Sequence, residues 1–248
     1  SIVDSIFAGQ MISDSALAAI GQIFPIYFVI IALGVGLSIG TTSLIANSIG
    51  ENNLENSGKV FSQSFILSII VSIIITVIGI YFSPSIISSI NNDQETLGLS
   101  IKYINIIFFG SIFIFILMSI NSSLSAQGDT KSYRNVLIFS FFLNILLNPI
   151  LISGKIFSFQ IMSPLGIEGI AYATIISQFV GIFYLFIKLS KTRIYKYVKI
   201  TIIPHFNIIR NILSQGIPAS IGMMMIAVGS YILIYFVGIF GVEAIAGY

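Results

Sequence analysis

The sequence contains no cysteine, no tryptophan, one histidine and very few charged residues. Without cysteine, neither a disulfide framework nor a thiolate metal site can form, and His205 alone excludes a multi-histidine metal centre. Only 8% of the 248 residues are charged, whereas soluble domains commonly carry about a quarter. So few charges cannot cover a surface that faces water, and a soluble domain is therefore excluded.

The motifs of common enzyme classes are also missing. The sequence has no glycine-rich phosphate loop, no serine-centred nucleophile elbow and no HExxH zinc motif. A formal net charge of +2 is too small to indicate a nucleic-acid partner. We therefore expect no enzyme, no organic cofactor and no nucleic acid.

Long apolar stretches fill most of the chain, which is 56% hydrophobic with a mean hydropathy of +1.03. A helix needs about 20 apolar residues to cross the roughly 30 Å of a bilayer core. A partial helix ends near Gly9, and six longer segments meet or approach that length: Ala16–Ile49, Val60–Phe82, Leu97–Leu124, Val136–Ile152, Ile167–Ile187 and Ile208–Phe240. Pro25 and Pro218 lie inside two of them and predict kinks. The fold class is all-α, a polytopic membrane helix bundle of seven helices.

The positive charges alternate between the loops. One set of loops and loop-flanking residues carries nine basic residues: Lys59, Lys131, Arg134, Lys188, Lys191, Arg193, Lys196, Lys199 and Arg210. The opposite set carries only Lys102 and Lys155. The positive-inside rule places the first set in the cytoplasm, so the first helix runs outward. We expect a multi-pass protein of a prokaryotic cell membrane, monomeric and surrounded by lipid.

The basic stretch before the last helix predicts a boundary between two bundles. We expect an amino-terminal bundle of six helices, the first truncated, over 1–190, a cytoplasmic linker over 191–206, and the truncated first helix of a second bundle over 207–248. An internal repeat supports this division: Phe7-Ala8-Gly9 and Phe236-Val237-Gly238 each close an outward helix before another small-residue stretch. Repeated bundles are common in secondary transporters. The remainder of the second bundle is then expected outside this sequence.

One carboxylate lies clearly inside a predicted span. Asp4 is nine residues from Ser13, where the outer loop begins, which is roughly 13 Å along a helix. Burying an ionisable group in a membrane is expensive, so Asp4 is a candidate functional residue. A purely structural pairing with a polar neighbour is the alternative.

Three neutral polar residues lie at a similar depth. Asn144 and Asn148 are four residues apart and share one face of an outward helix, and Thr174 lies near the outer end of the next helix. Pro149 cannot donate to the carbonyl of Ile145, which leaves another oxygen nearby. Hard cations prefer oxygen ligands of this kind, so we predict a cation site. Helix–helix packing through hydrogen bonds is the alternative for either asparagine alone.

Several stretches resemble the multidrug and toxic compound extrusion (MATE) family in the family's order. They are Val3 to Gly9 with Ala16 to Gly21, Gly34 to Gly50, Ala126 to Thr130, Asn144 to Pro149, Gly166 to Thr174, and Gly216 to Ala219. The resemblance covers nearly the whole chain. It implies a twelve-helix exporter of small amphipathic or cationic organic compounds in exchange for Na⁺ or H⁺. It also implies that Asp4 is the coupling carboxylate and that Asn144, Asn148 and Thr174 complete its cation site.

The sequence departs from the family pattern in two informative places. Many members have aspartate at the position of Asn148, so a second carboxylate is missing here and the coupling ion, Na⁺ or H⁺, stays open. Some members carry a glutamate where this chain has Ile226, so their second cation site is incomplete here. A flippase for lipid-linked oligosaccharides or peptidoglycan precursors is the nearest alternative, although no Lys or Arg occupies the middle of a predicted span. A membrane-embedded enzyme and a channel subunit or scaffold are the more distant ones.

Overall fold

The computed structural model describes residues 2–90, 93–156, 159–201 and 203–247. The α-helices in this part of the chain are α1 (Ile2–Met11), α2 (Asp14–Gly50), α3 (Leu54–Ile90), α4 (Gln94–Ala126), α5 (Lys131–Ser153), α6 (Ile167–Ser190), α7 (Phe206–Gly238) and α8 (Val242–Gly247). Six of them, α2 to α7, are long and apolar enough to cross a membrane. The predicted all-α fold class and the six long spans are therefore confirmed.

Several boundaries differ from the prediction. The helix predicted over Val60–Phe82 extends over the whole of α3, because helices continue past the apolar segment until a turn or cap ends them. The last helix was predicted to reach Phe240, but α7 stops at Gly238 and a turn follows in which Gly241 has a φ of 101°. A further short helix, α8, follows that turn and was not among the seven predicted helices.

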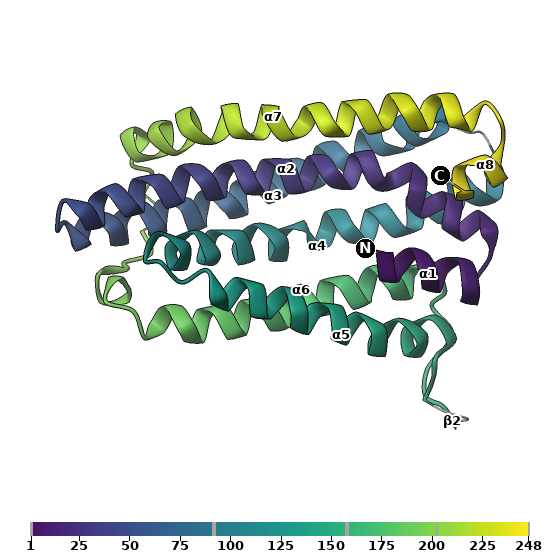
Figure 1. The fold of residues 1–248 in the computed structure, drawn as a ribbon, viewed down its shortest axis with the longest axis horizontal. Helices are drawn as coiled ribbons and strands as arrows, with labels where there is room; N and C mark the ends of the chain where they lie inside the picture. The colour runs from purple at the N-terminus through teal and green to yellow at the C-terminus, as the bar shows by residue number, and fades with distance from the viewer. Residues whose placement is uncertain (1, 91–92, 157–158, 202, 248) are drawn as a thin grey trace.

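The loop between α5 and α6 forms a small hairpin that hydropathy could not predict. Strands β1 (Lys155–Ile156) and β2 (Phe159–Gln160) pair in antiparallel register, and the hairpin projects from one end of the bundle (Figure 1). Within the same loop, the left-handed Gly154, with a φ of 69°, ends α5.

The long helices run side by side along one axis and alternate in direction (Figure 1). In this view α7 lies along α2 and α3 at the top, while α5 and α6 lie on the opposite side, beyond α4. In the most apolar 18-residue stretch of α4, 61% of the residues are buried, against 11% in the corresponding stretches of α3 and α7. The core therefore centres on α4, and α3 and α7 present most of their apolar surface outward.

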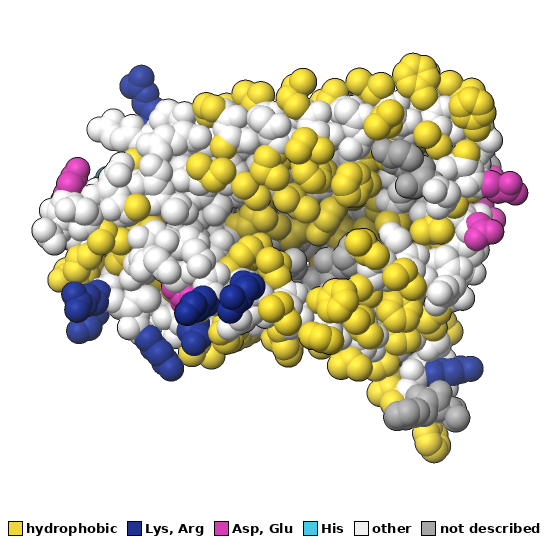
Figure 2. Space-filling view, in the orientation of Figure 1, with side chains coloured by type: hydrophobic (Ala, Val, Ile, Leu, Met, Phe, Trp, Pro, Cys, Tyr) yellow, Lys and Arg dark blue, Asp and Glu magenta, His cyan; other side chains and the backbone are white. Residues whose placement is uncertain are grey.

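Charged side chains gather at the two ends of the bundle, and its sides are mainly apolar (Figure 2). Most Lys and Arg side chains visible in this view lie at the end that holds the α4–α5 turn and the α6–α7 linker. The structure therefore separates the charges as the positive-inside assignment requires.

Turn residues explain how two helices begin at these ends. Ser13 caps α2, since its side chain accepts a hydrogen bond of 3.2 Å from the backbone N–H of Ala16. At the opposite end, Gly128 has a φ of 85°, and the Asp129 carboxylate accepts hydrogen bonds from the backbone N–H and the hydroxyl of Ser132 at 3.0 and 2.6 Å. These hydrogen bonds lower the pKa of Asp129, the Ser132 hydroxyl contributing most.

Small residues on one face of α2 pack closely against α7. A Cβ at Gly40 would lie 2.2 Å from the carbonyl oxygen of Ile212, and one at Gly36 would lie 1.8 Å from Oγ of Ser220. In return, a Cβ at Gly216 would lie 2.6 Å from the carbonyl oxygen of Gly36. The two backbones can approach this closely only because the contact positions are glycines. Pro25 and Pro218 lie inside α2 and α7, and kinks there stay a prediction.

The α6–α7 linker lies against α3 and contains a 3₁₀ turn, η1 (Ile194–Tyr197). Gln63 of α3 is buried and donates hydrogen bonds to the carbonyl oxygens of Thr201 at 3.5 Å and Ile203 at 3.1 Å. It also accepts a bond of 2.9 Å from the backbone N–H of His205. This one side chain therefore fastens the second half of the linker. The segment lies between Ser190, the last residue of α6, and Phe206, the first residue of α7, and the division into two bundles with a linker over 191–206 stays a prediction.

Candidate cation-binding site

Asp4 lies in α1 and is only 1% exposed. Its carboxylate oxygen Oδ1 accepts a hydrogen bond of 3.2 Å from the side-chain amide of Asn148 in α5. The structure thus brings together two of the predicted site residues that are 144 positions apart in the sequence. This contact joins α1 to the rest of the bundle.

Asn144 and Asn148 lie one turn apart on α5, and both side chains are buried. The Asn144 amide donates to the carbonyl oxygen of Ser140 at 2.8 Å and to the hydroxyl of Ser177 in α6 at 3.1 Å. The Oδ1 atoms of both asparagines are buried and have no hydrogen-bond partner in the described part of the chain. Two amide oxygens, one on the residue that binds Asp4 and one a helical turn away, are therefore available to a ligand.

Thr174 lies on α6, one turn before Ser177, and is half-buried. Its side chain lies within interaction range of Tyr103 of α4. Tyr103 and Tyr27 of α2 both lie within electrostatic range of the Asp4 carboxylate. Thr174 therefore reaches the surroundings of Asp4 through a tyrosine.

The sequence analysis did not identify Tyr27, Tyr103 or Ser177. The depth of each residue in the membrane could have identified Tyr103. It lies nine positions after Gln94, the first residue of α4, and Asp4 likewise lies nine positions before Ser13. Both lie roughly 13 Å along a helix from its outer end. Depth alone could not have shown which face of α4 turns toward α1 and α6.

The arrangement combines one carboxylate with neutral oxygens inside the bundle. Among the described residues there is no group of three or more His, Cys, Asp or Glu side chains that could hold a metal ion. The oxygens of Asp4, Asn144 and Asn148, with the hydroxyls of Thr174 and Tyr103, are the donors that suit a hard cation. A single carboxylate balances a single positive charge, which fits Na⁺ or a proton better than a divalent ion.

Known proteins resemble the chain over nearly its whole length. It is 29% identical to the probable multidrug resistance protein YoeA of Bacillus subtilis (strain 168), an alignment that covers 100% of this chain and 53% of the relative. The chain spans about half the length of the curated relatives it matches. Six helices long and apolar enough to cross a membrane, together with bacterial relatives of this kind, make it a multi-pass protein of the plasma membrane.

Two solved structures are informative about the fold. An inward-facing conformation of a multidrug resistance MATE family transporter of the MOP superfamily superposes with a TM-score of 0.86 and 29% identity, covering 99% of this chain and 54% of that one. An outward-facing conformation of such a transporter superposes with a TM-score of 0.76 and 31% identity, and the match covers 90% of this chain and 48% of that one. The family model described as MatE matches residues 1–150, more than half of the sequence, and the chain therefore belongs to the MatE family.

Proposed function

We propose that the protein is a secondary active transporter that exports small amphipathic or cationic organic compounds in exchange for Na⁺ or H⁺. Membership of the MatE family supports this proposal, as do relatives named for multidrug resistance and multidrug export. In this proposal Asp4, Asn144, Asn148 and Thr174 form the coupling site. The chain would contribute the first bundle and the beginning of the second.

The observation that carries the proposal is the pair of unpartnered amide oxygens near Asp4. Leaving a buried acceptor without a hydrogen bond costs about 1–3 kcal/mol, and both Asn144 Oδ1 and Asn148 Oδ1 are in this state among the described residues. A cation coordinated by these oxygens and by the Asp4 carboxylate would offset that cost. The site is therefore better suited to binding an ion than to serving only as helix packing.

Ion binding would be coupled to movement through α1. The Asn148–Asp4 bond links this helix to α5. An ion held between Asp4 and the α5 asparagines would stabilise the docked position of α1, while loss of the ion would weaken it. Binding drives transport only if the ion favours one conformation over the other.

The flippase alternative is less well supported. A flippase for a lipid-linked precursor would benefit from basic side chains deep in its cavity. Here the basic residue farthest from a helix end is Lys102, eight residues into α4, and its side chain is exposed. The relatives quoted above are named for drug resistance and export.

To test this proposal, the efflux of a cationic dye is measured from transporter-deficient cells that express the complete gene. Wild type is compared with Asp4→Asn, with Na⁺ present and absent. We expect export by wild type and its loss in Asp4→Asn at equal membrane expression, and the Na⁺ dependence identifies the coupling ion. Unchanged export by Asp4→Asn would contradict the coupling role, and no export by well-expressed wild type would favour the flippase.

A further inference from the structure

An apolar cavity lies between α3, α4, α6 and the linker, away from the residues of the cation site. Its volume is about 450 Å³, within the range of roughly 300–1,000 Å³ that is typical of small-molecule sites. Its lining is almost wholly aliphatic and aromatic: Phe61, Phe65, Phe113, Ile116, Ile120, Phe179, Ile182, Phe183, Phe186, Tyr195, Val198 and Ile200. Such a cavity would receive an apolar chain or ring.

The aromatic wall on α6 is partly exposed on the outside of the bundle. Phe179, Phe183 and Phe186 are 45%, 55% and 47% exposed. The rings also contact one another and the linker, with edge-to-face pairs between Phe179 and Phe183 at 4.9 Å and between Phe186 and Tyr195 at 5.9 Å. The cavity is therefore open toward the side of the bundle, where the acyl chains of the membrane lie.

Helix geometry gives the depth of the cavity. Phe186 precedes the end of α6 at Ser190 by four residues, and Phe179 precedes it by eleven. At the helical rise these rings lie roughly 6 and 16 Å below the linker. The aromatic wall therefore spans the acyl region immediately beneath the cytoplasmic headgroups.

The last turn of α6 and the linker above the cavity are strongly basic. Five basic residues occupy twelve positions, and all are exposed: Lys188, Lys191, Arg193, Lys196 and Lys199. The sequence has no acidic residue between Glu168 and Glu243. Lys196 directly follows Tyr195, and Lys199 lies between Val198 and Ile200, so both belong to the stretch that lines the cavity.

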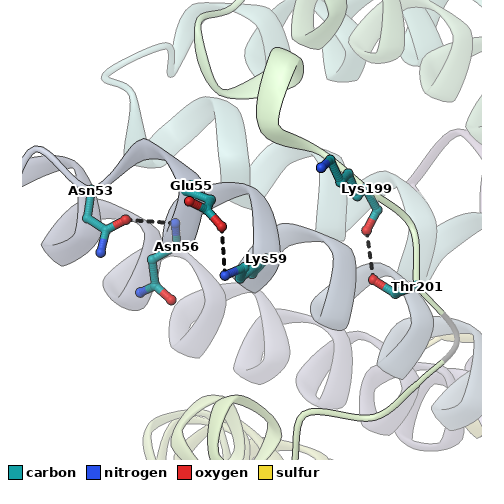
Figure 3. Close-up of polar contacts among 6 residues, drawn as sticks. All are labelled: Asn53, Glu55, Asn56, Lys59, Lys199 and Thr201. Carbon is teal, nitrogen blue, oxygen red and sulfur yellow. Dashed lines mark hydrogen bonds and ion pairs between the residues drawn. The ribbon is translucent and has the colours of Figure 1, made fainter.

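Two acidic residues have an electrostatic effect on these basic side chains, Asp129 on Lys188 and Glu55 on Lys199. Glu55 is also ion-paired with Lys59 at 2.8 Å. Figure 3 shows this pair on α3 beside the linker residues Lys199 and Thr201. Since Lys59 already offsets the charge of Glu55, the mouth of the cavity keeps a positive balance.

We propose that this cavity and the basic linker together bind one anionic phospholipid of the cytoplasmic leaflet. An acyl chain would lie among the α6 phenylalanines, and the phosphate would lie near Lys196 and Lys199. Basic side chains beside a membrane attract anionic headgroups, and the cavity provides the fixed apolar surface that makes the interaction specific. A cationic amphiphile is disfavoured here because the mouth carries charge of the same sign.

The experiment measures lipid binding by native mass spectrometry of the full-length protein in detergent. Dioleoylphosphatidylglycerol and dioleoylphosphatidylcholine share their acyl chains and differ in headgroup charge. We expect several-fold more of the first lipid to remain bound at equal concentration. The double variant Lys196→Gln with Lys199→Gln should reduce binding to the level of phosphatidylcholine, and Ile116→Trp, which fills the cavity, should lower binding of both lipids.

Arg210→Gln is the matched control, because it removes one positive charge from the same end of the bundle on α7. It should leave lipid binding unchanged. Equal binding of the two lipids by wild type would overturn the proposal, as would an equal loss in Arg210→Gln. Displacement of the lipid by tetraphenylphosphonium, with binding of that cation lost in Ile116→Trp, would assign the cavity to a cationic amphiphile instead. If Ile116→Trp unfolds in detergent, Phe183→Ser at the cavity mouth takes its place with the same expectation.

Discussion

The side-chain amide of Asn148 donates a hydrogen bond of 3.2 Å to Oδ1 of Asp4, which links α5 to α1. Both side chains are buried. A neutral amide therefore occupies the position from which many MATE proteins, by resemblance, would present a second carboxylate. The ionic behaviour of the proposed site depends on this difference.

Asn148→Asp should change how export depends on pH. The new carboxylate would lie within hydrogen-bond distance of Asp4. Two carboxyl groups this close either share one proton or, when both are ionised, need a cation between them. We expect dye efflux to depend more steeply on pH in Na⁺-free medium than it does in wild type. Efflux assays across a pH series would measure this. A profile identical to that of wild type would contradict the assigned contact, and Asn148→Leu, which removes the donor, should reduce export at every pH.

Gly216→Ala should destabilise the contact between α2 and α7. Its Cβ would lie 2.6 Å from the carbonyl oxygen of Gly36, which is backbone and cannot rotate away. We expect a loss of about 1–3 kcal/mol, as is common for overpacked sites. Loss of the helical circular dichroism signal on heating in detergent would measure this.

Gly222→Ala is the control for that substitution on the same helix. A Cβ there would meet no atom within 4 Å, and alanine favours a helix by about 1 kcal/mol over glycine. Its unfolding midpoint should therefore stay equal or rise. Equal midpoints for the two variants would show that the close contact does not limit stability.

Gln63→Leu should release the linker from α3. The substitution removes the bonds to the carbonyls of Thr201 and Ile203 and to the N–H of His205. We expect trypsin to cleave after the basic residues of the linker several-fold faster, because local opening then costs less free energy. Limited proteolysis in detergent would measure the rate. Gln215→Leu, an exposed position on α7, should cleave like wild type, and an unchanged rate in Gln63→Leu would contradict the anchoring role.

Asp129 should make a small contribution to stability that is lost in acid. Hydrogen bonds from Ser132 hold the pKa of this carboxyl below its usual value. Since the folded pKa lies below the unfolded one, the contribution is complete above about pH 4 and disappears as the pH falls through the folded value. Asp129→Asn cannot titrate, so the difference between its unfolding midpoint and that of wild type should shrink below about pH 4. A constant difference across the acid range would show that Asp129 does not titrate with folding.

Hydropathy alone was enough to predict the class of the protein and most of its helices. The scarcity of charge excluded a soluble domain, and apolar segments of sufficient length located α2 to α7. Counting residues from the helix ends also placed Asp4, Asn144 and Asn148 at a similar depth. These properties depend on composition and on distance along one helix, which a sequence contains directly. The turn at Gly241 that separates α7 from α8 was missed, because hydropathy continues across it.

The tertiary structure decided which helix faces meet. Only packing shows that Tyr103 of α4 reaches Thr174 of α6, that Gln63 binds the backbone of the linker, and that phenylalanines from three helices enclose one cavity with the linker. In a bundle of nearly all-apolar helices, the hydrophobic pattern hardly distinguishes one face from another. Close contacts at glycines and a few buried polar pairs choose the faces, and such contacts exist only once several helices are assembled.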